Sequence, residues 1–279
     1  NTTELLDEST QQRLFDPTTL NNDISIDKIN ASNGIINFFF TDGTSYSIEE
    51  KKIIKEFKSQ NLDPISIDKI KWDSSFKNIQ KFKFNEEIFE SKVMHELLVT
   101  FYKYGFVILE NVPVSENYII KFANSIGSVR RTNFGEFFNV KSKPNPNDLA
   151  YTPLALAPHT DNPYRNPVPC IQLLHCIENE VTGGLSTLVD GYTITEKLKK
   201  DYSDYYKILT EVKVRFQFID QTVILEDWAE MIQVNEKGRF KQVRFSPRLD
   251  FVPLIEKNKL ELFYLARKKI SELYNSEQY

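Results

Sequence analysis

The sequence has few of the residues that build disulfide frameworks and metal centres: its 279 residues include two cysteines and three histidines. Cys170 and Cys176 belong to one short segment that reads as a strand. At the rise of an extended chain they would lie roughly 20 Å apart, which is too far for a disulfide bond. We therefore expect two reduced thiols in a cytoplasmic protein.

Long apolar runs and a strong charge of either sign are also missing. The sequence has no apolar run of about 18 residues and no secretory leader, which argues against membrane spanning and secretion. Its 35 basic and 39 acidic residues give a net charge of -4, so neither nucleic acid nor an anionic membrane is expected as the main partner. Because the chain begins at Asn1 rather than Met, we expect a trimmed product or the ordered part of a longer one.

The composition favours strands and a sizeable core. Hydrophobic residues make up 41% of the chain, with 21 Phe and 13 Tyr. We expect a small β-rich N-terminal domain over residues 1–72, opening with a polar leader at 1–30, and a main domain over 73–279.

Turn signals and side-chain periodicity predict the elements of both domains. An Asp42-Gly43 turn joins apolar strands at 34–40 and 45–48 into a hairpin. Residues 132–150, rich in Phe, Asn and Pro, read as a long loop of the kind that often carries function. The predicted helices are 49–60, 86–105 (ended by Gly105), 115–126, 193–200 and 253–275. The other predicted strands are 106–109, 169–176, 185–189, 209–220, 232–234 and 240–245.

The main candidate for chemistry is His159-Thr160-Asp161. On an extended chain, residues two positions apart point the same way, so the imidazole and the carboxylate can converge on one ion. Two histidines and one carboxylate on one face of an octahedron suit Fe(II) and leave the other positions open. Taken alone, the spacing is a weak signal, because a hydrogen-bonded His near a turn is the commoner explanation.

The short sequence motifs around this segment change that interpretation. They are Ala150-Tyr151-Thr152, His159-Thr160-Asp161, the Gln-Leu-Leu-His-Cys of 172–176, the Gly-Gly-Leu-Ser of 183–186 and Val189-Asp190-Gly191. In order and spacing they resemble the gamma-butyrobetaine and trimethyllysine hydroxylase branch of the taurine-dioxygenase-like Fe(II)/2-oxoglutarate oxygenases. The resemblance is specific over about residues 95–215 and looser on either side.

The resemblance implies an α+β fold: a double-stranded β-helix core, jelly-roll-like, with flanking helices. It implies hydroxylation of a small quaternary-ammonium, betaine-like substrate such as gamma-butyrobetaine. Fe(II) would be the cofactor, with 2-oxoglutarate as cosubstrate and O2 as oxidant. A homodimer is left open.

The resemblance also assigns residues to roles. His159 and Asp161 match the first two iron ligands and are the catalytic centre. Leu174 and Ser186 match positions that line the cosubstrate site, and Asn147 or Asp148 falls near a family Asn that contacts the cosubstrate. A carboxylate at Asp148 would repel that anion unless it is protonated or turned away.

Three aromatic residues, Phe134, Phe138 and Tyr151, match positions that surround a trimethylammonium group. Aromatic faces are the natural partners of a cation that has no hydrogen-bond donor. The alternative is that the three rings are ordinary core. Of the other histidines, His175 is expected to be a packed, hydrogen-bonded core residue, and His95 to be structural or exposed.

The sequence departs from the family pattern in three places. No histidine follows His175, so the third iron ligand and the nearby cosubstrate-clamping Arg are missing, and the chain is expected to lack its C-terminal strands. The N-terminal part has no Cys or His for a zinc site. The Arg-Phe-Ser-Pro-Arg of 244–248 replaces a region where relatives present Asn. Two alternatives therefore stay open: a dioxygenase for another small zwitterion, and a catalytically inactive binding homologue.

Overall fold

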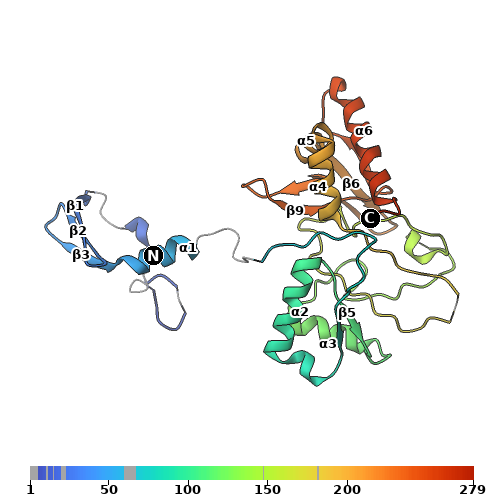
Figure 1. The fold of residues 1–279 in the computed structure, drawn as a ribbon, viewed down its shortest axis with the longest axis horizontal. Helices are drawn as coiled ribbons and strands as arrows, with labels where there is room; N and C mark the ends of the chain where they lie inside the picture. The colour runs from blue at the N-terminus through green and yellow to red at the C-terminus, as the bar shows by residue number, and fades with distance from the viewer. Residues whose placement is uncertain are drawn as a thin grey trace. The chain divides into compact units, whose positions relative to one another are not determined.

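The computed structural model describes residues 6–10, 12–14, 16–19, 23–59, 67–146, 148–180 and 182–279. The chain divides into two compact units, Asn1–Ile67 and Asp68–Tyr279 (Figure 1). The division falls before the boundary expected at residue 72, because Trp72 is held within the second unit. Its indole Nε1 donates a hydrogen bond to the carbonyl of Tyr104 at 2.8 Å.

The first unit contains a three-stranded antiparallel sheet in the order β1-β2-β3. The hairpin of β2 (Ile35–Phe40) and β3 (Ser45–Glu49) and the helix α1 (Glu50–Ser59) confirm the sequence prediction. A 3-10 turn, η2 (Pro17–Thr19), precedes the sheet.

The strand β1 (Ile26–Ser32) was not predicted, since residues 1–30 read as a polar leader. All its residues are exposed, so no buried face marks it as a strand in the sequence. The turn that follows explains why it pairs with β2. Asn33 and Gly34 both have positive φ, 53° and 72°, as a tight two-residue hairpin turn requires.

The second unit begins, in chain order, with a small cluster of helices and a parallel strand pair. Side chains from η3, α2 and α3 pack into a core of Ile88, Met94, Leu97 and Phe122. Gly105, with φ 80°, ends α2 as predicted. The elements are β4 (Lys81–Lys83), η3 (Glu86–Phe89), α2 (Ser91–Tyr104), β5 (Ile108–Glu110) and α3 (Asn117–Ile126).

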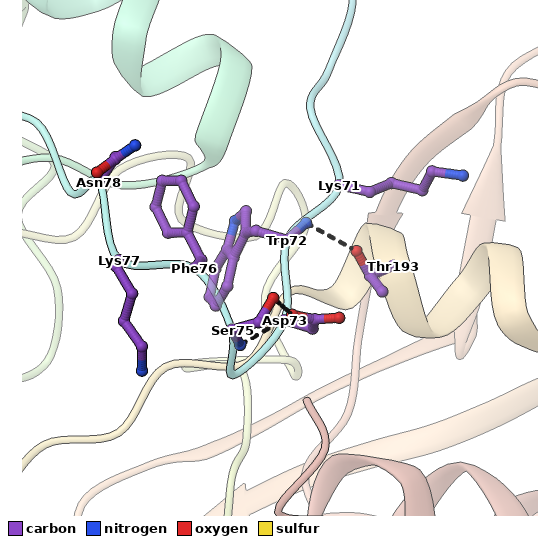
Figure 2. Close-up of a pocket in the computed structure, with 8 residues that line it drawn as sticks. All are labelled: Lys71, Trp72, Asp73, Ser75, Phe76, Lys77, Asn78 and Thr193. Atoms are coloured by element: carbon purple, nitrogen blue, oxygen red, sulfur yellow. Dashed lines mark hydrogen bonds between the residues drawn. The ribbon is translucent and has the colours of Figure 1, made fainter.

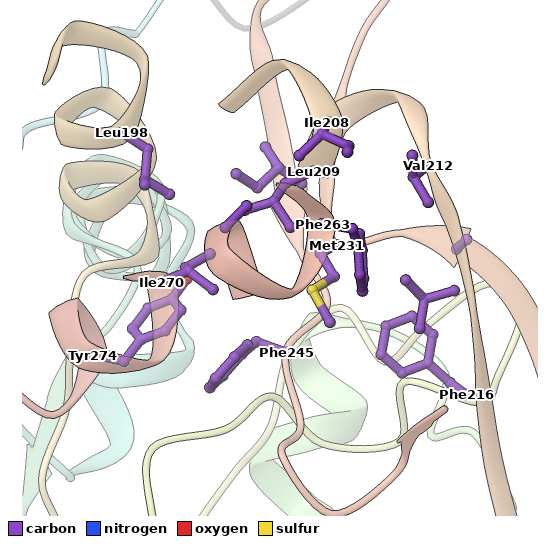
Figure 3. Packing of buried hydrophobic residues seen from close by; sticks show 14 of the residues in the cluster. Leu198, Ile208, Leu209, Val212, Phe216, Met231, Phe245, Phe263, Ile270 and Tyr274 are labelled. Carbon is purple, nitrogen blue, oxygen red and sulfur yellow. The ribbon is translucent and has the colours of Figure 1, made fainter. Parts of the chain in front are cut away.

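The larger core lies between an antiparallel sheet, ordered β10-β6-β7, and three helices (Figure 3). The strand β6 alternates as predicted, with Val214, Phe216 and Phe218 buried. The helix α6 packs against α4 and α5. The elements are α4 (Gly191–Asp201), α5 (Ser203–Glu211), β6 (Lys213–Ile219), β7 (Ile224–Glu230), β8 (Ile232–Val234), β9 (Phe240–Val243), β10 (Asp250–Pro253) and α6 (Lys257–Tyr274).

Two predicted strands, 169–176 and 185–189, are wrong: these residues have no regular secondary structure. Several of their apolar side chains face solvent, with Leu174 71% and Leu185 91% exposed. A strand exists only where another strand takes up its backbone hydrogen bonds. Within the described residues, no segment pairs with either stretch.

The observed architecture is therefore a mixture of helices and mainly antiparallel strands. None of the helices in the described parts of the chain combines the length and the apolar character needed to cross a bilayer.

An ion pair ties α6 to β10 and gives a test of the fold. Arg267 donates to both carboxylate oxygens of Asp250, at 2.5 and 2.7 Å, and the Asp250 side chain is 1% exposed. Arg267→Met would leave this carboxylate buried without its partner, so we expect a loss of about 3 kcal/mol in the free energy of unfolding. Lys268→Met, at the exposed neighbouring position, is the matched control for urea denaturation. Equal losses in both variants would contradict the assigned role.

Candidate functional site

The His-Thr-Asp segment is fixed to the large core through its middle residue. The Thr160 amide donates to the Phe245 carbonyl at 2.7 Å, and the Phe245 amide donates back to Thr160 Oγ1 at 3.0 Å. Phe245 follows β9 and is 2% exposed. Thr160 is therefore held from both directions, which fixes the backbone from which the two flanking side chains extend.

His159 and Asp161 come together as the sequence predicted. His159 Nε2 lies 3.2 Å from Asp161 Oδ1, and His159 Nδ1 lies 2.7 Å from the Ala157 carbonyl. When Nδ1–H donates to that carbonyl, a neutral ring turns the Nε2 lone pair toward the carboxylate. Such a contact is favourable when a proton lies between the two groups or when a metal cation does.

The charges at the pair reflect the same geometry. The hydrogen bond that a protonated His159 donates to Asp161 is the largest cause that raises the pKa of His159, while burial opposes it. The hydrogen bond from His159 lowers the pKa of Asp161, again against burial. The positive charge of Arg248 acts on both groups in the direction that favours the carboxylate and disfavours the imidazolium.

The second carboxylate oxygen of Asp161 accepts a hydrogen bond from Gln172 Nε2 at 2.6 Å. This bond leaves Oδ1 as the oxygen that shares a side with His159 Nε2. A neutral imidazole nitrogen and a carboxylate oxygen form a donor set that fits a divalent transition metal. The described residues contain no group of three or more His, Cys, Asp or Glu that could hold a metal ion by itself.

The predicted cosubstrate residues lie apart from this hydrogen-bonded group. Leu174 and Ser186 are exposed on the irregular stretch, and no hydrogen bond of the described residues joins either to the pair. Asp148 instead begins the 3-10 turn η4 (Leu149–Tyr151), where its Oδ1 accepts from the Ala150 amide at 2.8 Å. Asn147 lies outside the described residues.

The expectation for His175 is corrected in one respect. Both of its ring nitrogens are buried, but neither has a hydrogen-bond partner within the described residues. His95 is exposed on α2, in agreement with the sequence.

The three predicted aromatic residues form part of a continuous row of rings. Phe134 contacts Phe138 with centroids 5.4 Å apart, and Phe138 meets Tyr151 edge-on at 6.5 Å. In the other direction, Phe134 meets Phe218 at 5.7 Å, and Phe218 stacks on Tyr164 at 5.1 Å. The row thus runs from Tyr151, past Phe218 of the large core, to Tyr164, which follows Asp161 closely in the chain.

A buried guanidinium supports the same region. Arg244 donates to the Pro163 carbonyl at 3.1 Å and to the Asp227 carboxylate at 2.5 Å, and its side chain is 5% exposed. It therefore joins β7 and the segment after β9 to the chain just beyond Asp161. Sequence reasoning noted Arg244 only as part of the Arg-Phe-Ser-Pro-Arg of 244–248 and assigned it no role.

A separate pocket of about 410 Å³ lies at the start of the second unit (Figure 2). Its wall is formed by residues 71–78 without Ser74, together with Thr193 of α4. The Trp72 amide donates to Thr193 Oγ1 at 3.1 Å, which joins the two sides. The pocket contains none of the predicted site residues. We interpret it as part of the packing between residues 71–78 and α4.

The chain belongs to the taurine catabolism dioxygenase TauD, TfdA family, whose pattern it matches over residues 72–279. Gamma-butyrobetaine dioxygenase of Pseudomonas sp. (strain AK-1) is 32% identical over 169 residues, which are 61% of this chain and 44% of that protein. The human protein of the same name is 31% identical over 193 residues, 66% of this chain and 49% of the relative. Mouse mitochondrial trimethyllysine dioxygenase is 26% identical over 215 residues, which are 76% of this chain and 51% of that protein.

The chain spans about half the length of these relatives. The comparisons confirm the resemblance to the gamma-butyrobetaine and trimethyllysine branch. The structure adds residues that sequence reasoning missed. Gln172 could have been noticed, because it is the one polar residue in the run 171–174, whereas Thr160 was interpreted only as a spacer between two ligands.

The Thr160 clamp can be tested directly. Thr160→Val keeps the shape of the side chain but removes the oxygen that accepts from the Phe245 amide. Because that amide would stay buried without an acceptor, we expect the free energy of unfolding to fall by about 1–3 kcal/mol. Thr160→Ser keeps the oxygen and should lose less in the same denaturation experiment. A serine variant as unstable as the valine variant would show that the hydroxyl bond is unimportant.

Proposed function

We propose that the protein is an Fe(II)- and 2-oxoglutarate-dependent dioxygenase that hydroxylates a small quaternary-ammonium, betaine-like substrate such as gamma-butyrobetaine. The observation that carries this proposal is the convergence of His159 Nε2 and Asp161 Oδ1 at 3.2 Å in a chain of the TauD, TfdA family. The relatives named as gamma-butyrobetaine and trimethyllysine dioxygenases support the substrate class.

His159 and Asp161 would hold the iron. The hydrogen bond to the Ala157 carbonyl orients the imidazole, which would leave Nε2 for the ion, and the bond from Gln172 to Oδ2 would leave Oδ1 for it. Bound Fe(II) would supply the oxidising chemistry with O2 and 2-oxoglutarate, while the protein positions the reacting groups and excludes water. We place Leu174, Ser186 and Asp148 near the cosubstrate from the family pattern alone.

The aromatic row would hold the cationic end of the substrate. Phe138 contacts both Phe134 and Tyr151, and Tyr151 is 4% exposed. A trimethylammonium group is attracted to ring faces and has no use for hydrogen-bond acceptors. We further propose that the unit Asp68–Tyr279 is the oxygenase domain, with a double-stranded β-helix core, and that the N-terminal unit holds no zinc.

A second candidate is a homologue that binds such substrates without oxidising them. It is favoured by one observation: the candidate ligands His159 and Asp161 lie in contact, and the described residues contain no group of three or more His, Cys, Asp or Glu that could hold a metal ion. The two candidates share the aromatic row and differ in whether the chemistry follows binding.

Metal binding and turnover separate these candidates, and the complete gene product is the material for the test. We expect anaerobic binding of Fe(II) and 2-oxoglutarate, then succinate release on adding O2 with one of a panel of betaines. His159→Ala should weaken iron binding by at least about 100-fold, beyond the loss typical of an outer-shell substitution. His95→Ala, at an exposed position on α2, should not change it. Iron binding without succinate from any betaine would favour the binding homologue.

The aromatic row predicts a loss that is specific to the substrate. Tyr151→Ala should raise the KM for a trimethylammonium substrate by between about twofold and thirtyfold, because a cation–π contact is lost. The KM for 2-oxoglutarate should change much less. Tyr151→Phe retains the ring face and should stay near the wild-type values. Equal changes in both KM values for Tyr151→Ala would argue against a cation site here.

A further inference from the structure

A cation of the protein itself already lies on the face of Tyr151. Lys143 Nζ is 3.5 Å from the centroid of the Tyr151 ring, which is van der Waals contact between an ammonium group and an aromatic face. The two residues are also joined through the backbone, because the Lys143 amide donates to the Tyr151 carbonyl at 3.0 Å. The ammonium group is thus tethered beside the ring.

The ring is held in place, whereas its cover is not. Tyr151 closes the 3-10 turn that Asp148 caps, its ring meets the edge of Phe138, and it is 4% exposed. Lys143 is an exposed residue on the long loop before that turn, and no ion pair of the described residues includes it. Moving the lysine side chain into solvent would uncover the ring face without breaking an ion pair or the core.

A tethered ammonium and a free cationic ligand would compete for one face. An intramolecular competitor acts at a high effective concentration, so it lowers the apparent affinity of every cation that needs the same place. We propose that Lys143 is a specificity-determining residue that occupies the Tyr151 face in the free protein and must be displaced by a cationic substrate. This inference rests on the proposed function only in taking the substrate to be a cation.

Displacement has a consequence for the kind of ligand that binds well. A released Lys143 ammonium would lie close to the bound ligand, and in the structure no ion pair of the described residues includes it. A zwitterion brings a carboxylate that can receive this ammonium, whereas a simple cation leaves two like charges near each other. Lys143 would therefore select zwitterions over simple cations of equal size.

Binding of tetramethylammonium tests the competition without iron, 2-oxoglutarate or turnover. We expect Lys143→Gln to bind this probe about two- to fivefold more tightly than the wild type, which corresponds to the loss of one exposed cation–π contact. Lys143→Arg keeps a cation and should bind like the wild type. Lys141→Gln removes a neighbouring exposed charge from the same loop and should also leave the affinity unchanged.

The effect of Lys143→Gln must also depend on the Tyr151 ring. In a Tyr151→Leu background, Lys143→Gln should no longer change the affinity for tetramethylammonium, since the contested face is gone. Unchanged or weaker binding by Lys143→Gln, or no binding by any variant, would overturn the proposal. So would equal tightening by Lys141→Gln, which would show a general charge effect. None of these outcomes depends on succinate release, so a failure here is distinct from a failure of the proposed oxygenase activity.

Discussion

Three hydrogen bonds between Thr160 and Phe245 connect the candidate metal ligands to the folded core. The chain around His159 and Asp161 is irregular, and an irregular backbone has no ladder of its own to fix it. Thr160 supplies that support by exchanging bonds with a residue that is buried beside α6. Arg244 adds a second tie just beyond the pair. The geometry of His159 and Asp161 therefore depends on contacts with the core more than on the local chain.

The sequence predicted elements where a local rule decides the structure, and failed where a partner decides it. The helix α2 was found because apolar periodicity and Gly105 both mark it. The strand β1 was missed because no residue of it is buried, so only the Asn-Gly turn after it shows the pairing. Residues 169–176 show the opposite case, because apolar composition indicates a strand only when another strand lies beside it. The helix α5 was missed where its apolar residues continue directly into β6.

The same distinction holds at the candidate site. His159 and Asp161 could be predicted, because spacing along an extended chain sets which way two side chains point. The tie through Thr160 could not, since its partner lies 85 positions further along the chain. Lys143 could not be found either: an exposed lysine on a loop has no pattern that distinguishes it from its neighbours. Contacts of this kind appear only when the loop and the 3-10 turn are both in place.

The row of rings from Tyr151 to Tyr164 includes Phe218, a residue of the sheet that is itself part of the large core. Because the candidate site and the core share Phe218, we expect them to unfold together. By thermodynamic linkage, a ligand that orders Tyr151 and its neighbours would raise the melting temperature of the whole second unit. A core substitution at Phe218 would in turn be felt as a loss of ligand affinity, although Phe218 need never touch the ligand.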